Sequence, residues 1–228
     1  MKTKLLLLIA VIVLLTGGQA DALPDKIFTS SGQILPGEEW NLVYIYNDDT
    51  IVDMLGGSAD WIATYDASTL NVVDGSADIE AFDYSTVHIS GGSLGIVRSS
   101  ASSTLSFSDS ASADSIRSAN FATTTITGGT TVDISVVDSA VVGLYGGTIT
   151  DYISAYDSST INIYGYDLVK TSAGGLYGYG QVNGYLADDT YFSVDLYNTD
   201  AYSHINLVPE PCTLVLVGVG ALLVRRKK

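Results

Sequence analysis

The chain has 228 residues with 25 acidic and 10 basic side chains, which gives a formal net charge of −15. This length suits one domain, and an apolar fraction of 46% provides material for a sizeable core, which excludes a charged disordered chain. The lack of a basic stripe excludes a nucleic-acid-binding domain, and the single cysteine excludes a disulfide framework and a cysteine-based zinc site.

Residues 1–22 have the pattern of a secretory signal peptide. Two lysines precede an apolar run over residues 5–15, and Ala20-Asp21-Ala22 fits the small-x-small pattern of a cleavage site. The run is short for a membrane span, which needs about 20 residues. We therefore expect export and a mature chain that begins near Leu23, with a permanent N-terminal anchor as the alternative.

Residues 23–47 precede a region of repeats. Trp40 is followed by alternating Leu42, Tyr44 and Tyr46, which is the pattern of a β-strand. Repeat proteins need a cap to cover the exposed edges of their terminal repeats. We expect residues 23–47 to form an N-terminal cap strand.

A repeat of about 18 residues occupies residues 48–166. Turn dipeptides recur at steps of 18, 17, 18, 19, 18 and 19 residues: Gly56-Gly57, Asp74-Gly75, Gly91-Gly92, Asp109-Ser110, Gly128-Gly129, Gly146-Gly147 and Gly165-Tyr166. Apolar residues stand two positions before all seven turns: Met54, Val72, Ile89, Phe107, Ile126, Leu144 and Ile163. Four positions before the turns, only Thr124 is polar. Apolar residues at a spacing of two define the buried face of a strand, so each repeat contains a strand just before its turn.

A second strand is expected after each turn. Further apolar residues recur there: Ile62, Ile79, Val97, Ile116, Ile134 and Ile153. Turn-favouring residues then mark a second corner: Asp66, Asp83, Ser100, Asn120, Asp138 and Asp157. The sequence therefore predicts an all-β fold, a parallel β-solenoid (β-helix) of about seven coils, each burying its apolar residues against its neighbours. A sandwich of unrelated strands would not explain six consecutive steps within one residue of 18.

The acidic residues of the repeat allow two interpretations. Asp66, Asp83, Asp138 and Asp157 recur at the second corner, and a further group follows the first corner: Asp60, Asp78, Asp114 and Asp151. Carboxylates stacked about 4.8 Å apart repel one another unless they are hydrogen-bonded or bridged by a cation such as calcium. Aspartate also caps turns by accepting hydrogen bonds from nearby amides, and no Gly-Gly-x-Gly-x-Asp calcium repeat is present. We favour turn capping within each coil, and calcium is the only cofactor that the pattern suggests.

No catalytic motif stands out. His88 is expected to face outward on a strand, and neither it nor His204 has the Ser and Asp neighbours of a catalytic triad. Arg98 and Arg117 are 19 residues apart and should be neighbours on one face, close to Asp114. Parallel β-helices often support polysaccharide lyases and hydrolases, so this pair gives an alternative hypothesis of a surface polysaccharide-active enzyme.

Residues 167–208 break the period and are rich in Tyr and Gly. Asn183-Gly184 is a typical hairpin turn, so we expect a small antiparallel β cap there. Without the two ends of the chain, residues 23–208 hold 23 acidic and 4 basic side chains, which gives −19. Such a charge keeps molecules soluble and disfavours anionic partners.

Residues 209–228 form a tail with three parts. Pro209-Glu210-Pro211 is followed by an apolar stretch over residues 214–224 and then by four bases, Arg225, Arg226, Lys227 and Lys228. The bases favour the cytoplasmic side, and the segment before them is short for a permanent span of about 20 residues. In order, spacing and length this tail resembles the PEP-CTERM sorting signal of bacterial exported proteins, with Cys212 where that family often has a small residue such as Ala. An ordinary C-terminal membrane anchor is the alternative.

The resemblance implies recognition by an exosortase in the inner membrane, cleavage near Pro209-Glu210-Pro211 and a link to exopolysaccharide or biofilm production. Together with the repeats, it leads us to expect an exported, non-catalytic structural or adhesive protein of the cell surface or extracellular matrix. The expected partners are the exosortase during export, the inner membrane transiently through the tail, and exopolysaccharide or like surface proteins. No nucleic acid and no catalytic residue are expected.

Overall fold

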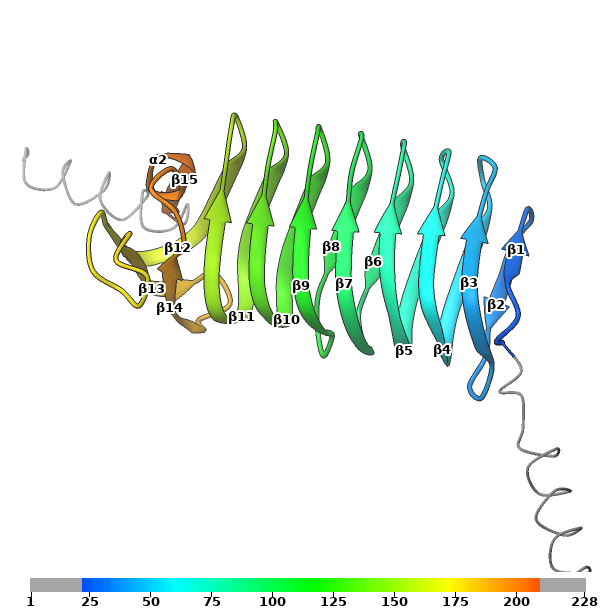
Figure 1. Cartoon of the computed structure of the whole chain (residues 1–228). Helices are drawn as coiled ribbons and strands as arrows, with labels where there is room; N and C mark the ends of the chain where they lie inside the picture. Colours follow the sequence, from blue (N-terminus) through cyan, green and yellow to red (C-terminus); the bar gives the residue numbers. More distant parts are fainter. Residues whose placement is uncertain (1–21, 210–228) are drawn as a thin grey trace, which may run out of the picture.

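The computed structural model describes residues 22–209, which form a rod of stacked coils (Figure 1). Strands make up most of this part of the chain, and its one helix is the four-residue α2 (Ala201–His204). The strands are β1 (Lys26–Phe28), β2 (Gly32–Ile34), β3 (Glu39–Ile45), β4 (Ile51–Thr64), β5 (Thr69–Ala81), β6 (Thr86–Ile89), β7 (Ser93–Ser99), β8 (Thr104–Phe107), β9 (Ser112–Ser118), β10 (Thr123–Val136), β11 (Val141–Ala155), β12 (Thr160–Thr171), β13 (Gln181–Leu186), β14 (Tyr191–Leu196) and β15 (Ile205–Pro209).

Each coil consists of two straight segments joined by two corners. In the coil of β4, residues 51–54 form the first segment, the chain bends at Gly56-Gly57, and residues 58–64 form the second segment before the turn at 65–68. Strands β4, β5, β10 and β11 each contain both segments, whereas in the coils between them the segments are separate strands, β6 with β7 and β8 with β9. Neighbouring coils pair in parallel. The predicted parallel β-solenoid of about seven turns is confirmed.

Glycine is required at the first corner because successive coils approach closely there. Gly92 and Gly147 have φ values of 89° and 92°, in the left-handed region that favours glycine. A Cβ at Gly92 would lie 2.7 Å from the carbonyl oxygen of Gly75, and one at Gly147 would lie 2.7 Å from that of Gly128. At Gly92 and Gly147, both the backbone angle and the contact between coils therefore exclude a side chain.

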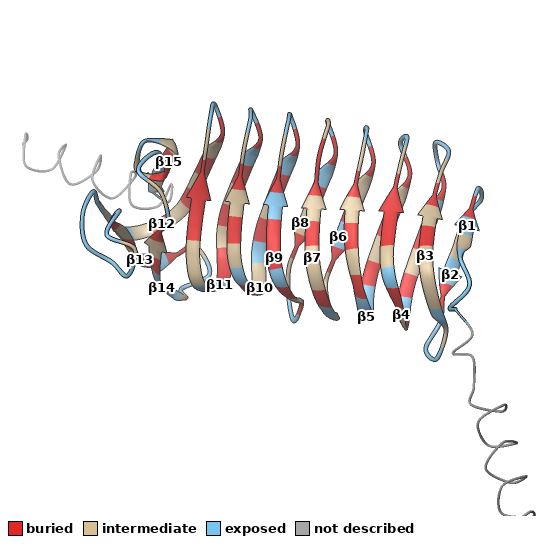
Figure 2. Ribbon diagram, in the orientation of Figure 1, coloured by how far each residue is buried: buried red, intermediate tan, exposed pale blue. Residues whose placement is uncertain are grey.

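The core is a set of apolar columns that run along the rod. All residues two positions before the first corner are buried, from Met54 in β4 to Ile163 in β12, and so is the column predicted in the second segments, from Ile62 in β4 to Ile153 in β11. Figure 2 shows buried positions recurring in coil after coil. The polar exception, Thr124, is fully buried, and its hydroxyl lies 2.9 Å from that of Ser99 and 2.7 Å from that of Ser118. A hydrogen-bonded hydroxyl cluster thus replaces apolar contact at this one level of the core.

The parallel stack begins earlier in the chain than the sequence pattern suggested. Residues 23–47 were expected to form a cap strand, but they contain β1, β2 and β3, of which β2 and β3 both pair in parallel with β4. Residues 32–45 therefore form a coil of the solenoid. The corresponding corner is Pro36-Gly37, with Gly37 at a φ of 86°, and it lacks the paired glycines that mark four of the seven recognised corners.

The C-terminal end combines antiparallel and parallel pairing. Strand β13 pairs antiparallel with both β12 and β14, and β15 then returns to pair in parallel with β12. The predicted turn at Asn183-Gly184 is wrong, because both residues lie inside β13 and the chain turns at residues 187–190. Gly184 instead allows β13 to approach β12 closely. Its φ is 146°, and a Cβ there would lie 2.7 Å from the carbonyl oxygen of Asp167 in β12.

Candidate functional site

The outer surface of the second segments, which we call the second-segment face, carries two rows of side chains parallel to the rod axis. The buried column of the second segments, which we call the isoleucine column, comprises Ile62, Ile79, Val97, Ile116, Ile134 and Ile153. The leading row lies directly before this column and comprises Trp61, Asp78, Ile96, Ser115, Asp133 and Tyr152. The trailing row lies directly after that column and comprises Ala63, Glu80, Arg98, Arg117, Ser135 and Ser154. Side chains alternate along a strand, so both neighbours of a buried residue point away from the core. Within the rows Ala63, Ser115 and Ser154 are nevertheless buried.

Charged side chains occupy the middle of this face. Arg98 and Arg117 are paired neighbours in β7 and β9, as the sequence predicted. The Arg98 guanidinium forms an ion pair of 3.2 Å with Glu80, the only ion pair among residues 22–209. Arg117 is exposed, and its Nε donates to the Ser115 hydroxyl at 3.2 Å. Its two terminal nitrogens are therefore available to a ligand.

The carboxylates of the face each accept a hydrogen bond. The Ser115 hydroxyl donates to Asp133 Oδ1 at 2.7 Å, and the amide of Ile96 donates to Asp78 Oδ1 at 2.8 Å. Asp114 was expected close to the arginines, but the carboxylate connected to Arg117 is that of Asp133, through Ser115. Asp114 comes before the leading row, and its side chain is exposed. The face therefore presents a hydrogen-bonded network of donors and acceptors.

An aromatic cluster lies at the N-terminal end of the face. The rings of Tyr44 and Trp61 meet edge to face at 5.9 Å, with an angle of 89° between their planes. Tyr44 also stacks on Tyr46, and the stack continues through Tyr65 to Phe82, with ring centroids 4.9 Å apart in its last two steps. Edge-to-face and offset-stacked pairs are the favoured arrangements of aromatic rings. These contacts give Trp61 a fixed orientation at the start of the leading row.

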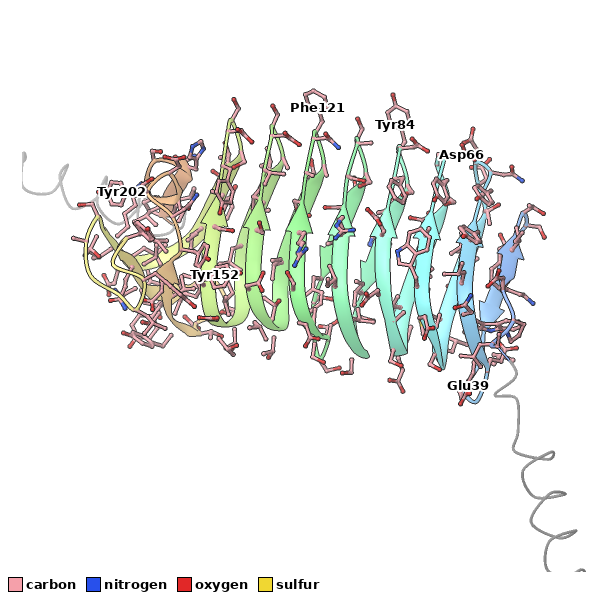
Figure 3. All side chains as sticks on the ribbon, in the orientation of Figure 1. Glu39, Asp66, Tyr84, Phe121, Tyr152 and Tyr202 are labelled. Atoms are coloured by element: carbon pink, nitrogen blue, oxygen red, sulfur yellow. The ribbon has the colours of Figure 1, made fainter. Side chains whose placement is uncertain are left out.

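A second aromatic cluster lies at the C-terminal end of the same face. Tyr152 stacks on Tyr197 with centroids 4.6 Å apart, and Tyr177 packs edge to face against both. The Tyr177 hydroxyl donates to Asp151 Oδ1 at 2.8 Å, and this hydrogen bond, followed by burial, raises the pKa of Tyr177 to about 12. Burial is the main cause of the raised pKa of Tyr152. Figure 3 shows Tyr152 on the body of the rod, whereas Tyr84 and Phe121 project from the tips of the coils.

The two aromatic clusters were not identified from the sequence, although one signal was present. Trp61 and Tyr152 each stand directly before a residue of the isoleucine column, Ile62 and Ile153, so their common row could have been derived from the repeat. Tyr177 and Tyr197 lie outside the periodic region. Their approach to Tyr152 depends on the path of the cap, which the period does not predict.

The aspartates of the second corner cap the preceding coil rather than their own. Asp66 and Asp138 adopt left-handed backbone, with φ values of 57° and 60°. Asp66 Oδ2 accepts the amide proton of Asn47 at 2.9 Å, and Asp138 Oδ2 accepts that of Asn120 at 3.1 Å. The side chain therefore bonds the amide of the equivalent corner residue one coil earlier. The expectation that each aspartate bonds its own coil was wrong, and the carboxylates link neighbouring coils.

The remaining members of this column follow the same backbone pattern. Asp83 and Asp157 have φ values of 54° and 58°, and Asp83 Oδ2 accepts the amide proton of Asp66 at 3.4 Å. The column position assigned to Ser100 belongs to Ala101, which has the left-handed φ of 54°. The earlier assignment was wrong by one residue because no Asp or Asn marks this corner.

The acidic residues after the first corner do not form one column. Asp78 pairs with Trp61, so it occupies the leading row, one position later in its coil than Asp60. Asp60 and Asp114 are exposed, while Asp151 accepts the Tyr177 hydroxyl. In the part of the chain that the structure describes, no group of three or more His, Cys, Asp or Glu side chains has a geometry that could hold a metal ion.

The two histidines lie apart from this face. His88 is exposed on β6, as the sequence predicted. His204 ends α2, and its Nδ1 lies 2.7 Å from the carbonyl oxygen of Ser159. This contact joins α2 to the last full turn of the rod.

The predicted signal peptide at 1–22 and the predicted sorting tail at 209–228 lie outside the described residues, apart from Ala22 and Pro209. Pro209 ends β15, pairs with Gly165 and lines a pocket of about 220 Å³ together with Tyr166, Leu168 and Leu207. Within residues 22–209, no helix has the length and apolar character needed to cross a membrane.

We compared the chain with protein-family models, with curated proteins and with solved structures, and found no match in any of the three comparisons.

Proposed function

We propose that the chain is an exported, non-catalytic surface or extracellular-matrix protein with a structural or adhesive role toward exopolysaccharide. The observation that carries this proposal is the second-segment face, where aromatic and charged side chains follow one another in axial rows along a straight rod. An extended row of this kind suits a partner that is itself a long chain. A small-molecule site would instead gather its polar groups in a concave pocket.

Export and sorting are proposed from the two ends of the chain. The signal-like segment at 1–22 directs the chain across the inner membrane, and an exosortase-type enzyme processes it near Pro209-Glu210-Pro211. Among the described residues, the last strand, β15, ends at Pro209, the first residue of the proposed sorting signal. Cleavage after Pro209 would leave every described strand in the released rod.

An enzyme acting on polysaccharide is the alternative function, and the second-segment face gives the basis for comparing the two. Glycoside cleavage needs an acid and a base that are available to the scissile bond. Glu80 is paired with Arg98, and Asp133 accepts a hydrogen bond from Ser115. These carboxylates therefore stabilise the arrangement of the face, which favours binding over catalysis.

The sorting part of the proposal is tested by replacing Pro209-Glu210-Pro211 with three alanines in cells that express an exosortase. We expect a longer product retained in the membrane fraction, because the tail supplies both the anchor and the processing site. Alanines at Thr148 and Thr150, exposed on β11, are the control and should be processed normally. Release of the tail variant at the size of the wild-type product would rule out this sorting route.

A further inference from the structure

We propose that the second-segment face is a binding site for an uncharged polysaccharide, whose chain runs parallel to the rod axis from Trp61 to Tyr152. This inference rests on the proposed adhesive function and adds to it the location of the site and the chemical class of the ligand. Three properties of the face support it: the paired aromatic clusters, the polar groups between them and the distribution of charge.

The aromatic clusters at the two ends of the face share a diagonal contact between the rows, which is edge to face in the first and stacked in the second. In each, a tyrosine associated with the trailing row reaches diagonally to an aromatic ring of the leading row: Tyr44 to Trp61, and Tyr197 to Tyr152. Tyr197 remains 43% exposed. Sugar rings present C–H groups on their faces and can pack on aromatic surfaces, which have a negative π face. Two such platforms on one line would hold a polymer at two points.

The distance between the platforms requires a chain-like ligand. Five coil steps separate Trp61 from Tyr152, which corresponds to about 24 Å at the spacing of about 4.8 Å between neighbouring strands. A monosaccharide cannot reach both platforms, whereas an extended oligosaccharide can.

The middle of the face offers the hydrogen-bonding groups that sugar hydroxyls need. A hydroxyl both donates and accepts, so it matches a surface where arginine donors lie beside carboxylate acceptors. Arg117 keeps its terminal nitrogens available beside Ser115 and Asp133, and the Arg98 side chain is 38% exposed in its pair with Glu80. Ile96 provides an apolar position in the leading row between Asp78 and Ser115.

The charge distribution selects against an anionic polymer. Residues 23–208 carry −19 overall, which repels polyanions at a distance. The face itself is nearly balanced, because Arg98 and Arg117 oppose three carboxylates, those of Asp78, Glu80 and Asp133. Two of the four basic residues of the body are therefore used to neutralise this face. A uronate-rich polymer would meet the negative field of the rod, whereas an uncharged polymer would not.

The test measures binding of the processed protein to exopolysaccharide from the cells that produce it, separated by anion exchange into uncharged and acidic fractions. Native gel electrophoresis with each fraction in the gel reports the dissociation constant through retardation of the protein. We expect binding to the uncharged fraction. Trp61→Ala and Tyr197→Ala should each weaken it at least about fivefold, the scale of one aromatic contact. Arg117→Gln, which leaves the aromatic platforms intact, should weaken it as well.

The control variants are Tyr84→Ala and Phe121→Ala, because these rings are 73% and 72% exposed but lie at the coil tips, away from the face. They should bind as the wild-type protein does.

Equal losses of binding in the control and face variants would contradict the site. Wild-type binding that none of the three face variants weakens would overturn the site and leave the adhesive function intact. Binding to the acidic fraction alone would overturn the ligand class, and binding to neither fraction would overturn the adhesive function too. Thermal melts separate loss of binding from loss of folding.

Discussion

Aspartate recurs at the second corner because two properties are needed there at once. The backbone is left-handed, a conformation that costs most L-residues about 1–2 kcal/mol but that Asp and Asn adopt more readily. The side chain must also accept the amide proton of the corner one coil earlier, as Asp66 does from Asn47. Ala101 has the left-handed φ of 54° but has neither advantage.

Ala101→Asn should therefore stabilise the protein. Asn tolerates the left-handed backbone, so we expect the free energy of unfolding to rise by about 1 kcal/mol, measured by urea denaturation. Ser102→Asn, at the next and exposed residue of the same turn, is the control and should change stability by no more than about 0.5 kcal/mol. A lower stability of Ala101→Asn than of the wild type would contradict this explanation of the corner.

The buried columns predict a large difference in stability between two substitutions that both introduce aspartate. Ile126 is 3% exposed, so Ile126→Asp buries an unpaired charge and should cost several kcal/mol. His88 is exposed on the outer side of the first segments, and His88→Asp should cost no more than about 0.5 kcal/mol. Denaturation midpoints followed by circular dichroism compare the two. Equal effects would show that the assignment of inner and outer positions is incorrect.

At the scale of elements, the C-terminal cap depends on close packing of β13 against β12. Gly184 permits this approach, since a Cβ would collide with backbone atoms of Asp167 and Leu168, each 2.7 Å away. Gly178, in the loop before β13, also has a positive φ, 81°, but no atom lies within 4 Å of a Cβ built on it. Alanine substitutions at these two glycines therefore allow the cost of backbone strain to be measured separately from the cost of a steric collision.

Gly178→Ala should cost about 1–2 kcal/mol from its left-handed backbone alone. Gly184→Ala should cost more, because the strands must also separate, and the loss should be localised in the cap. Hydrogen exchange measures this directly: amides of β13 and β14 should exchange faster in Gly184→Ala, while those of β4 and β5 stay protected. Uniformly faster exchange along the whole rod, or no difference between the two variants, would argue against this role of Gly184.

The sequence predicted the elements of the repeat well because period and burial coincide. The three apolar columns that the sequence predicted are all buried, since each coil must bury the same positions against its neighbours. The buried columns that contain Leu94 and Val136 were not identified, because small and polar residues interrupt them. The first coil was missed because Pro36-Gly37 replaces the paired glycines, and Asn183-Gly184 was misassigned because a close contact requires the same glycine as a hairpin turn does. The aspartates were recognised as corner residues, but the amides that Asp66, Asp83 and Asp138 bond belong to another coil, which local sequence does not specify.

At the scale of the whole molecule, the body must tolerate a charge of −19. Cross-coil hydrogen bonds at the second corner connect the aspartates of neighbouring coils. If calcium were bound, a hundredfold excess over its dissociation constant would add about 2.7 kcal/mol to the stability of the folded state. Monovalent salt would only screen the repulsion between charges.

We therefore expect the same melting temperature in chelator and in millimolar calcium at matched ionic strength. Asp66→Asn with Asp83→Asn should retain most of the stability, because Asn also tolerates the left-handed corner and keeps an acceptor oxygen. A rise of several degrees that is specific to calcium and lost in the double variant would show that calcium is a structural cofactor.

The central claim is that the rod binds exopolysaccharide without cleaving it. The most direct measurement is size-exclusion chromatography with light scattering, after incubation of the processed protein with exopolysaccharide from the producing cells. We predict that the protein elutes with the polymer and that the molar mass of the polymer, measured after removal of the protein, is unchanged over time. A falling polymer mass would establish an enzyme, and separate elution of protein and polymer would contradict the adhesive role.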